Sequence, residues 1–172
     1  MIYQATADTA YTALQDGGNA GRVTVPDVAV RIAGAMLALA VAAVHIADQG
    51  GVTAFTSPDW IGWSYRLIEV GGVLTALVLL LPRPVRLAPA WTGWAAGVLL
   101  GAGPFAAYIL TRTVGLPGET GDVGHWGNGV GPVSLFVEAA LVVLSVTMLL
   151  ALRQFAVPGA LRDLPGRARP AR

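Results

Sequence analysis

Four long apolar runs, separated by short polar segments, dominate the pattern of hydrophobic and polar positions along the chain. Each run has about 20 residues, the length that an α-helix needs to cross roughly 30 Å of hydrocarbon. The pattern therefore predicts four membrane-spanning helices, at residues 28–48, 60–81, 90–112 and 131–152. We expect them to pack as an all-α, four-helix membrane bundle over residues 26–153, between two tails at residues 1–25 and 154–172.

Residues near the ends of the runs support these limits. Trp60 and Trp63 stand where the second run begins, as expected of an aromatic belt at a membrane interface. Within the third run Gly93, Gly97 and Gly101 repeat every four residues, which predicts a smooth helix face that packs closely inside the bundle. Pro104 on the same helix predicts a kink.

Composition agrees with a protein in a bilayer. Only 12% of the 172 residues are charged and 55% are hydrophobic, whereas about 25% of a soluble domain is charged. The net charge of +1 offers no electrostatic reason to expect nucleic acid as a partner. The chain has no cysteine, which excludes disulfides and thiolate chemistry.

The distribution of arginine predicts the orientation. All eleven basic residues are arginines, and cytoplasmic loops of membrane proteins are enriched in basic residues. Arg22 and Arg31 flank the first run, Arg83 and Arg86 lie between the second and third, and five more follow the fourth. We therefore expect a multi-pass protein of a bacterial plasma membrane with both termini cytoplasmic, a mobile N-terminal tail and an arginine-rich C-terminal tail.

With this orientation, the polar residues within the runs fall at one depth, in the outer half of the membrane. They are His45, Arg66, Glu69, Tyr108, Arg112 and Glu138. A charged side chain in a span is costly unless it is paired or hydrated. The six residues are therefore expected to gather in an outer-leaflet polar cluster, the candidate binding site.

Two interpretations of this cluster remain open. In the first it is purely structural: Arg66 and Arg112 pair with Glu69 and Glu138 and hold the helices in register. In the second it lines an outward-facing pocket, covered by the glycine-rich segment at residues 113–130, that receives a small molecule, a lipid head group or quinone, or a metal ion.

A metal ion is the only cofactor that the residues suggest, and they do not identify it. The candidate ligands are imidazole and carboxylate groups, which suit zinc, copper or iron: His45, Glu69, Glu138, Glu119, Asp122 and His125. They come from different segments, without the paired spacing of a metal-binding helix. No arrangement of catalytic residues appears, so an enzyme is the less favoured interpretation.

The chain resembles a family of small four-span membrane proteins common in actinobacteria. The resemblance covers residues 28–152 and is carried by Tyr65 and Arg66, by GPFAAYILTRTVGLPG at the end of the third run and by GPVSLFVEAALVVL in the fourth. It implies a four-helix fold, a membrane location and an actinobacterial source. It implies no activity and no catalytic residue.

The function that we expect is that of an accessory or structural membrane protein, or of a small-ligand-binding, sensing module with an outward-facing polar cluster. One alternative is a metal- or redox-linked membrane protein that uses His45, Glu69 and Glu138. Another is an oligomeric transporter or channel unit, because four spans in one chain rarely suffice for transport. The expected partners are the lipid bilayer and either further copies of this chain or a larger membrane complex.

Overall fold

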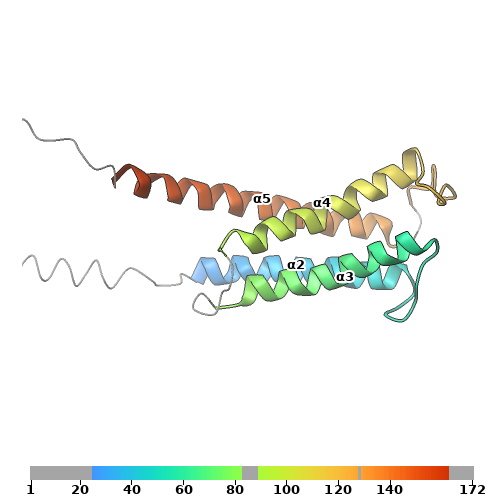
Figure 1. Cartoon of the computed structure of the whole chain (residues 1–172), viewed down its shortest axis with the longest axis horizontal. Coiled ribbons are helices and arrows are strands. Elements are labelled where there is room, and N and C mark those ends of the chain that lie inside the picture. Colours follow the sequence, from blue (N-terminus) through green and yellow to red (C-terminus); the bar gives the residue numbers. More distant parts are fainter. Residues whose placement is uncertain (1–24, 83–88, 128, 163–172) are drawn as a thin grey trace, which may run out of the picture. The chain divides into compact units, whose positions relative to one another are not determined.

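The computed structural model describes residues 25–82, 89–127 and 129–162. The regular secondary-structure elements of these residues are all helices, and Leu116 and Glu119 form an isolated bridge. The helices are α2 (Val25–Asp48), α3 (Asp59–Leu80), α4 (Thr92–Thr113) and α5 (Gly131–Arg162) (Figure 1). The prediction of four helices and no strands is thus confirmed for the described residues.

Three of the helices end within three residues of the predicted limits. The exception is α5, which continues to Arg162 although the sequence predicts a span ending at residue 152. Apolar residues become sparser after residue 152, but the chain remains helical, so the end of the apolar run does not mark the end of the helix. Residues 1–24 of the N-terminal tail predicted at 1–25, residues 163–172 of the C-terminal tail predicted at 154–172, and Arg83 and Arg86 lie outside the described residues.

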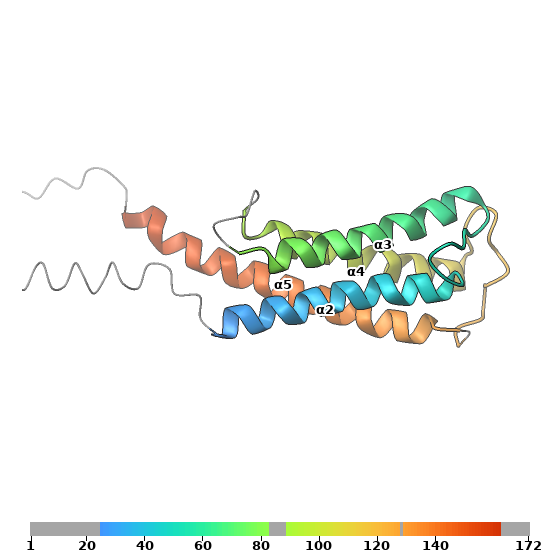
Figure 2. The same cartoon turned by 90° about the horizontal axis from the view of Figure 1, so that it is seen from below.

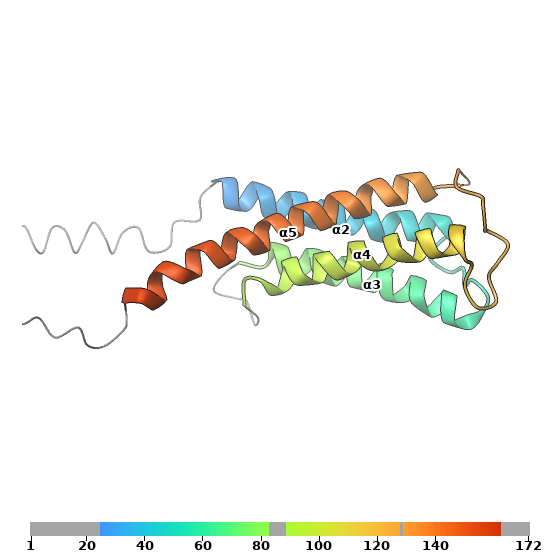
Figure 3. The same ribbon diagram turned by 90° about the horizontal axis from the view of Figure 1, so that it is seen from above.

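The chain divides into two compact units, residues 1–31 and residues 32–172. Of the first unit, the structure describes the opening turns of α2, with Asp27 in the first turn. The second unit holds the rest of α2 with α3, α4 and α5. In it, the segments that join α2 to α3 and α4 to α5 lie at the same end of the bundle (Figure 2), an arrangement that Figure 3 shows from the opposite side.

Glycines allow the helices of the second unit to approach closely. A Cβ atom at Gly101 would lie 2.7 Å from the main-chain oxygen of Glu138 on α5, and one at Gly97 would collide with the hydroxyl of Ser145. Between α2 and α3, a Cβ atom at Gly72 would lie 2.7 Å from the carbonyl oxygen of Ala38. At Gly72 and Gly101 the close contact is with main-chain oxygens, so a larger residue would have to shift the backbone, whereas at Gly97 the Ser145 side chain would have to move.

The outward faces of all four helices are apolar. Leu67, Leu99 and Phe136 are each 75% exposed or more, and Met36 on α2 is 63% exposed. Each helix is long and apolar enough to cross a membrane, and at most 39% of any of the four apolar segments is buried within the protein. A monomer in water rarely exposes so much contiguous apolar surface.

Candidate functional site

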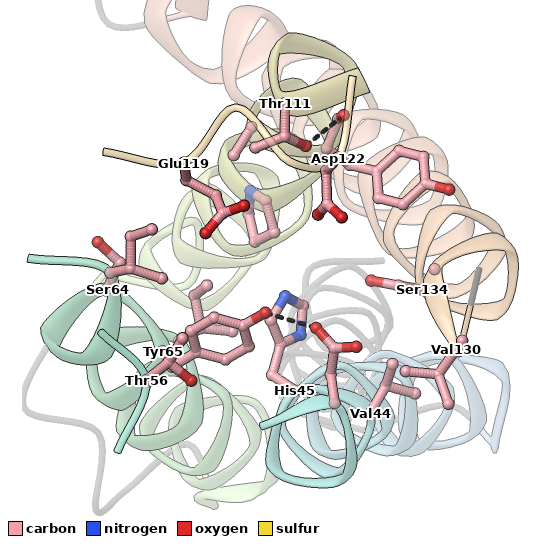
Figure 4. A pocket seen from close by; sticks show the side chains of 18 of the residues that line it. Val44, His45, Thr56, Ser64, Tyr65, Thr111, Glu119, Asp122, Val130 and Ser134 are labelled. Carbon is pink, nitrogen blue, oxygen red and sulfur yellow. Dashed lines mark hydrogen bonds between the residues drawn. The ribbon is translucent and has the colours of Figure 1, made fainter. Parts of the chain in front are cut away.

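A cavity of about 470 Å³ lies where the last turns of α2 and α4 meet the first turns of α3 and α5. The segment that joins α4 to α5 contributes Leu116, Glu119 and Asp122 to its wall. Figure 4 shows His45 and Tyr65 on one side of the opening, Ser134 on another, and Glu119 with Asp122 pointing towards it from the loop. The volume is in the range of small-molecule sites in proteins.

Glu138 is the most deeply buried acid of the cavity wall, with an exposed fraction of 1%. It stands one turn after Ser134 on α5, so both side chains occupy one helix face. The Ser134 hydroxyl donates a hydrogen bond to the Oε1 atom of Glu138. The Oε2 atom is buried and has no hydrogen-bond partner among the described residues.

His45 reaches the same carboxylate from α2. Its Nε2 atom lies 3.6 Å from the Oε1 atom of Glu138, and its Nδ1 atom is 2.9 Å from the carbonyl oxygen of Val41. A carbonyl oxygen only accepts, so Nδ1 must carry a proton. The imidazole orientation is therefore set by its own helix, and the remaining nitrogen faces Glu138 at a distance longer than a hydrogen bond.

Tyr65 and Asp48 form a second polar contact in the cavity wall. The Tyr65 hydroxyl on α3 donates to the Oδ2 atom of Asp48 at the end of α2. The rings of Tyr65 and His45 are 5.5 Å apart, centroid to centroid. Tyr65 thereby joins α2 to α3 beside the imidazole and leaves Asp48 with a neutral rather than a charged donor.

The loop that follows α4 is fastened over the cavity by side chains from the helices. Arg112 forms an ion pair with Asp122, Nη1 to Oδ2 2.5 Å, and its Nε atom donates to the carbonyl oxygen of His125 at 3.0 Å. The Arg112 guanidinium also lies 4.5 Å from the centroid of the Tyr108 ring, at cation–π distance.

Two further side chains donate to main-chain oxygens of the loop. The Tyr108 hydroxyl donates to the carbonyl oxygen of Trp126 at 2.5 Å, and the Trp60 indole donates to that of Pro117 at 3.2 Å. Gly115 and Gly118 have positive φ angles of 76° and 80°, which a residue with a side chain rarely adopts. Glycine therefore lets the chain turn back over the cavity directly after α4.

The structure separates the six predicted cluster residues into two groups. His45, Tyr108, Arg112 and Glu138 line the cavity. Arg66 and Glu69 do not line it. They form an ion pair with each other, Nη1 to Oε2 2.6 Å.

Gln49 and Ala54 complete this second group. The Gln49 side chain donates to Glu69, and Arg66 donates to the carbonyl oxygen of Ala54 at 2.5 Å. The group thus fastens the segment between α2 and α3 to α3. These contacts are of the kind that the first of the two interpretations expects for the whole cluster.

The predicted pairing of the charges is correct for Arg66 with Glu69 and wrong for Arg112 with Glu138. Arg112 is bound by Asp122 of the loop, while Glu138 meets Ser134 and His45. The error arises because the fold of the loop brings a nearer carboxylate to the guanidinium. The predicted pairs follow from depth in the membrane, and depth alone does not show which carboxylate the loop brings nearest to Arg112.

Several cavity residues are missing from the predicted cluster, notably Asp48, Tyr65 and Ser134. Two of them carry a local signal. Asp48 follows His45 by three residues and Ser134 precedes Glu138 by four, so each shares a helix face with a predicted residue. Tyr65 precedes the predicted residue Glu69 by four, but Glu69 does not line the cavity and the hydrogen-bond partner of Tyr65, Asp48, is on another helix, so that spacing does not point to the cavity.

The six predicted metal ligands are not brought together. In the part of the chain that the structure describes, no group of three or more His, Cys, Asp or Glu side chains is placed to hold a metal ion. Only His45 and Glu138 approach each other. Glu69 lies with Arg66, Asp122 with Arg112, and the Nδ1 atom of His125 is 3.0 Å from the carbonyl oxygen of Gly121.

Comparison with known proteins identifies no relative. No family model, no curated protein and no solved structure matches the chain.

Proposed function

We propose that this chain is a small-ligand-binding, sensing module of a bacterial plasma membrane. Its four helices cross the bilayer, both termini are cytoplasmic, and the cavity opens on the outer side. The proposal follows the resemblance to four-span actinobacterial membrane proteins for location, and the cavity for function. It assigns no catalytic step to the chain.

The exposed apolar side chains support insertion into a membrane. Leu67, Leu99 and Phe136 lie on three different helices and are each at least three-quarters exposed. Each such side chain would contribute about 1.5–3 kcal/mol if it were removed from water. Lipid provides that environment for all four helices at once.

The arginines support the orientation. Arg153 and Arg162 lie at the end of the bundle away from the cavity, in the last part of α5. Arg112 at the cavity end is held by Asp122, and Arg66 by Glu69. The positive-inside rule favours a cytoplasmic position for the end at which most arginines of the sequence lie, and hence an outer position for the cavity.

The Oε2 atom of Glu138 is the observation that carries the proposal of ligand binding. A purely structural network would satisfy each of its buried polar atoms, because an unsatisfied one costs about 1–3 kcal/mol. In the described residues Gln49 Oε1 and Ser145 Oγ are also buried without a partner, but of the three residues concerned only Glu138 lines the cavity. A ligand in the cavity would supply the missing donor.

Blocking the cavity tests the proposal. Ala107 lines the cavity, while its neighbour Ala106 is exposed on α4 and does not line it. The wild-type chain in nanodiscs would be screened by thermal unfolding against small polar, cationic, anionic and neutral compounds. We expect at least one stabilising compound, whose effect Ala107→Trp abolishes and Ala106→Trp preserves.

Equal loss of stabilisation in both tryptophan variants would contradict binding in the cavity. So would a panel in which no compound raises the unfolding temperature of the wild-type chain. The matched pair separates occupation of the cavity from a general effect of a large side chain on α4.

A further inference from the structure

We infer that the cavity takes a small organic cation, an ammonium or amidinium group attached to an apolar body. This inference rests on the proposed ligand-binding function and names the chemical class of the ligand. It follows from the charge of the cavity wall, from the carboxylates that lack a cation, and from the apolar and aromatic surface beside them.

The charges of the wall are strongly unequal. Among the described lining residues, four carboxylates face the cavity and Arg112 is the one guanidinium. The carboxylates are those of Asp48, Glu119, Asp122 and Glu138. The excess of negative charge is therefore three with a neutral His45 and two with a protonated one. A cavity of this sign favours a positive ligand and disfavours an anion.

Only one of these carboxylates is matched by a permanent positive charge. Asp122 pairs with Arg112 at 2.5 Å, and Asp48 receives a hydrogen bond from the neutral hydroxyl of Tyr65. Glu119 forms no hydrogen bond or ion pair through its side chain with any described residue. An occupant with donor groups therefore finds free acceptors in the wall.

Glu138 is the strongest of these acceptors. Its Oε1 atom is engaged by Ser134 and faces His45, whereas its Oε2 atom is buried without a partner in the described structure. A buried carboxylate oxygen without a donor is costly, and a charge-assisted hydrogen bond from a cation is about twice as strong as a neutral one. Glu138 is thus the anchor for the positive group.

The remainder of the wall suits an organic body rather than a hydrated metal ion. Val44, Ile61, Ile68 and Leu116 supply apolar surface, and Trp60 supplies an indole ring. Aromatic faces attract cations within about 6 Å. The volume of about 470 Å³ is an order of magnitude larger than the roughly 30 Å³ that one water occupies.

Three probes with one carbon frame test the inference: phenethylamine, which is cationic, phenethyl alcohol, which is neutral, and phenylacetate, which is anionic. Binding would be measured by titration calorimetry to the full chain in phosphatidylcholine nanodiscs, with empty nanodiscs subtracted for partitioning into lipid. We expect the amine to bind at least about tenfold more tightly than the alcohol, a difference of about 1.4 kcal/mol, and phenylacetate to bind most weakly.

Charge-removing variants locate the cation. Glu138→Gln is expected to weaken binding of the amine by about tenfold and to leave the alcohol unaffected, because the variant keeps the shape and removes the charge. Glu119→Gln should weaken it in the same direction without affecting the fold, since that carboxylate has no partner to lose. Asp59→Asn removes an exposed carboxylate of α3 outside the cavity wall, and should leave the affinity unchanged.

The outcomes distinguish this inference from the proposed function. If the alcohol or phenylacetate binds as tightly as the amine, the cavity binds ligands but not by charge, and the cation inference fails alone. Unchanged amine affinity in both Glu138→Gln and Glu119→Gln would also overturn it. If Glu138→Gln does not fold, the amine affinity of Glu119→Gln compared with that of Asp59→Asn tests the cation inference instead. If none of the three probes binds and no compound of the panel raises the unfolding temperature, both the cation inference and the proposed ligand-binding function fail.

Discussion

At the scale of single residues, Glu138 has two unlike oxygens. Ser134 donates to one, which also faces His45, while the other is buried without a donor in the described part of the chain. The side chains from α5 and α2 therefore engage one of the two carboxylate oxygens of Glu138. Oε1 therefore makes the structural contacts of Glu138, and Oε2 is the atom on which the proposed ligand binding depends.

The structural half can be measured separately. Ser134→Ala removes the donor to Oε1 and should lower the free energy of unfolding by about 1–3 kcal/mol, because a buried carboxylate loses a hydrogen bond. Ser64→Ala is the control, since the Ser64 hydroxyl only donates to Trp60 of its own helix and is exposed. Reversible unfolding in detergent micelles would give both values. Equal stabilities of the two variants would exclude the Ser134 hydrogen bond as a significant contribution.

At the scale of elements, α4 packs closely against α5 because glycines of α4 carry no side chain at the crossing. Gly97 and Gly101 allow the two backbones to meet, and Pro104, three residues further on, is buried at the cavity wall. Because Glu138 provides its main-chain oxygen to this crossing and its side chain to the cavity, close packing of α4 on α5 also positions the carboxylate.

Two glycines on α4 provide a matched test of that packing. Gly101→Ala would place a Cβ atom 2.7 Å from the Glu138 main-chain oxygen, and should destabilise the bundle by about 1–3 kcal/mol through overpacking. A Cβ atom at Gly103 meets no described atom within 4 Å, so Gly103→Ala should be neutral or stabilising by up to about 1 kcal/mol. Thermal unfolding of both variants checks this. A Gly101→Ala variant as stable as Gly103→Ala would contradict the close crossing.

At the scale of the whole molecule, the polar groups are concentrated at one end of residues 32–162. The ion pairs of Arg66 and Arg112 and the cavity all lie there, whereas Arg153 lies towards the other end of α5. In a bilayer, this distribution would place the binding chemistry on one side of the membrane and the arginine-rich end on the other.

Cysteine labelling tests that sidedness directly, because the chain has no native cysteine. Glu119→Cys places a thiol in the loop at the cavity and Arg162→Cys places one at the end of α5. An impermeant maleimide added to intact cells should label position 119 and not position 162, and both should react after the membrane is opened. The reverse pattern would invert the proposed orientation.

The sequence predicts the helices well because each apolar run is long enough to define a span without knowledge of its neighbours. It also predicts the Arg66–Glu69 pair, since residues three apart share a helix face. The sequence does not predict the Arg112–Asp122 ion pair or the Tyr65–Asp48 hydrogen bond. They depend on the path of a glycine-rich loop and on the rotation of one helix against another, and neither follows from hydrophobic periodicity.

The way in which the loop is fastened leaves its composition open to change. Tyr108, Arg112 and Trp60 donate to the carbonyl oxygens of Trp126, His125 and Pro117, and every amino acid carries such an oxygen. Substitutions at these three loop positions would preserve the main-chain acceptors. The side chains at these positions can therefore vary while the hydrogen bonds from the helices to the loop remain. By contrast, the ion pair of Arg112 restricts position 122, and positive φ angles restrict positions 115 and 118, so the tolerance to substitution differs from one loop position to the next.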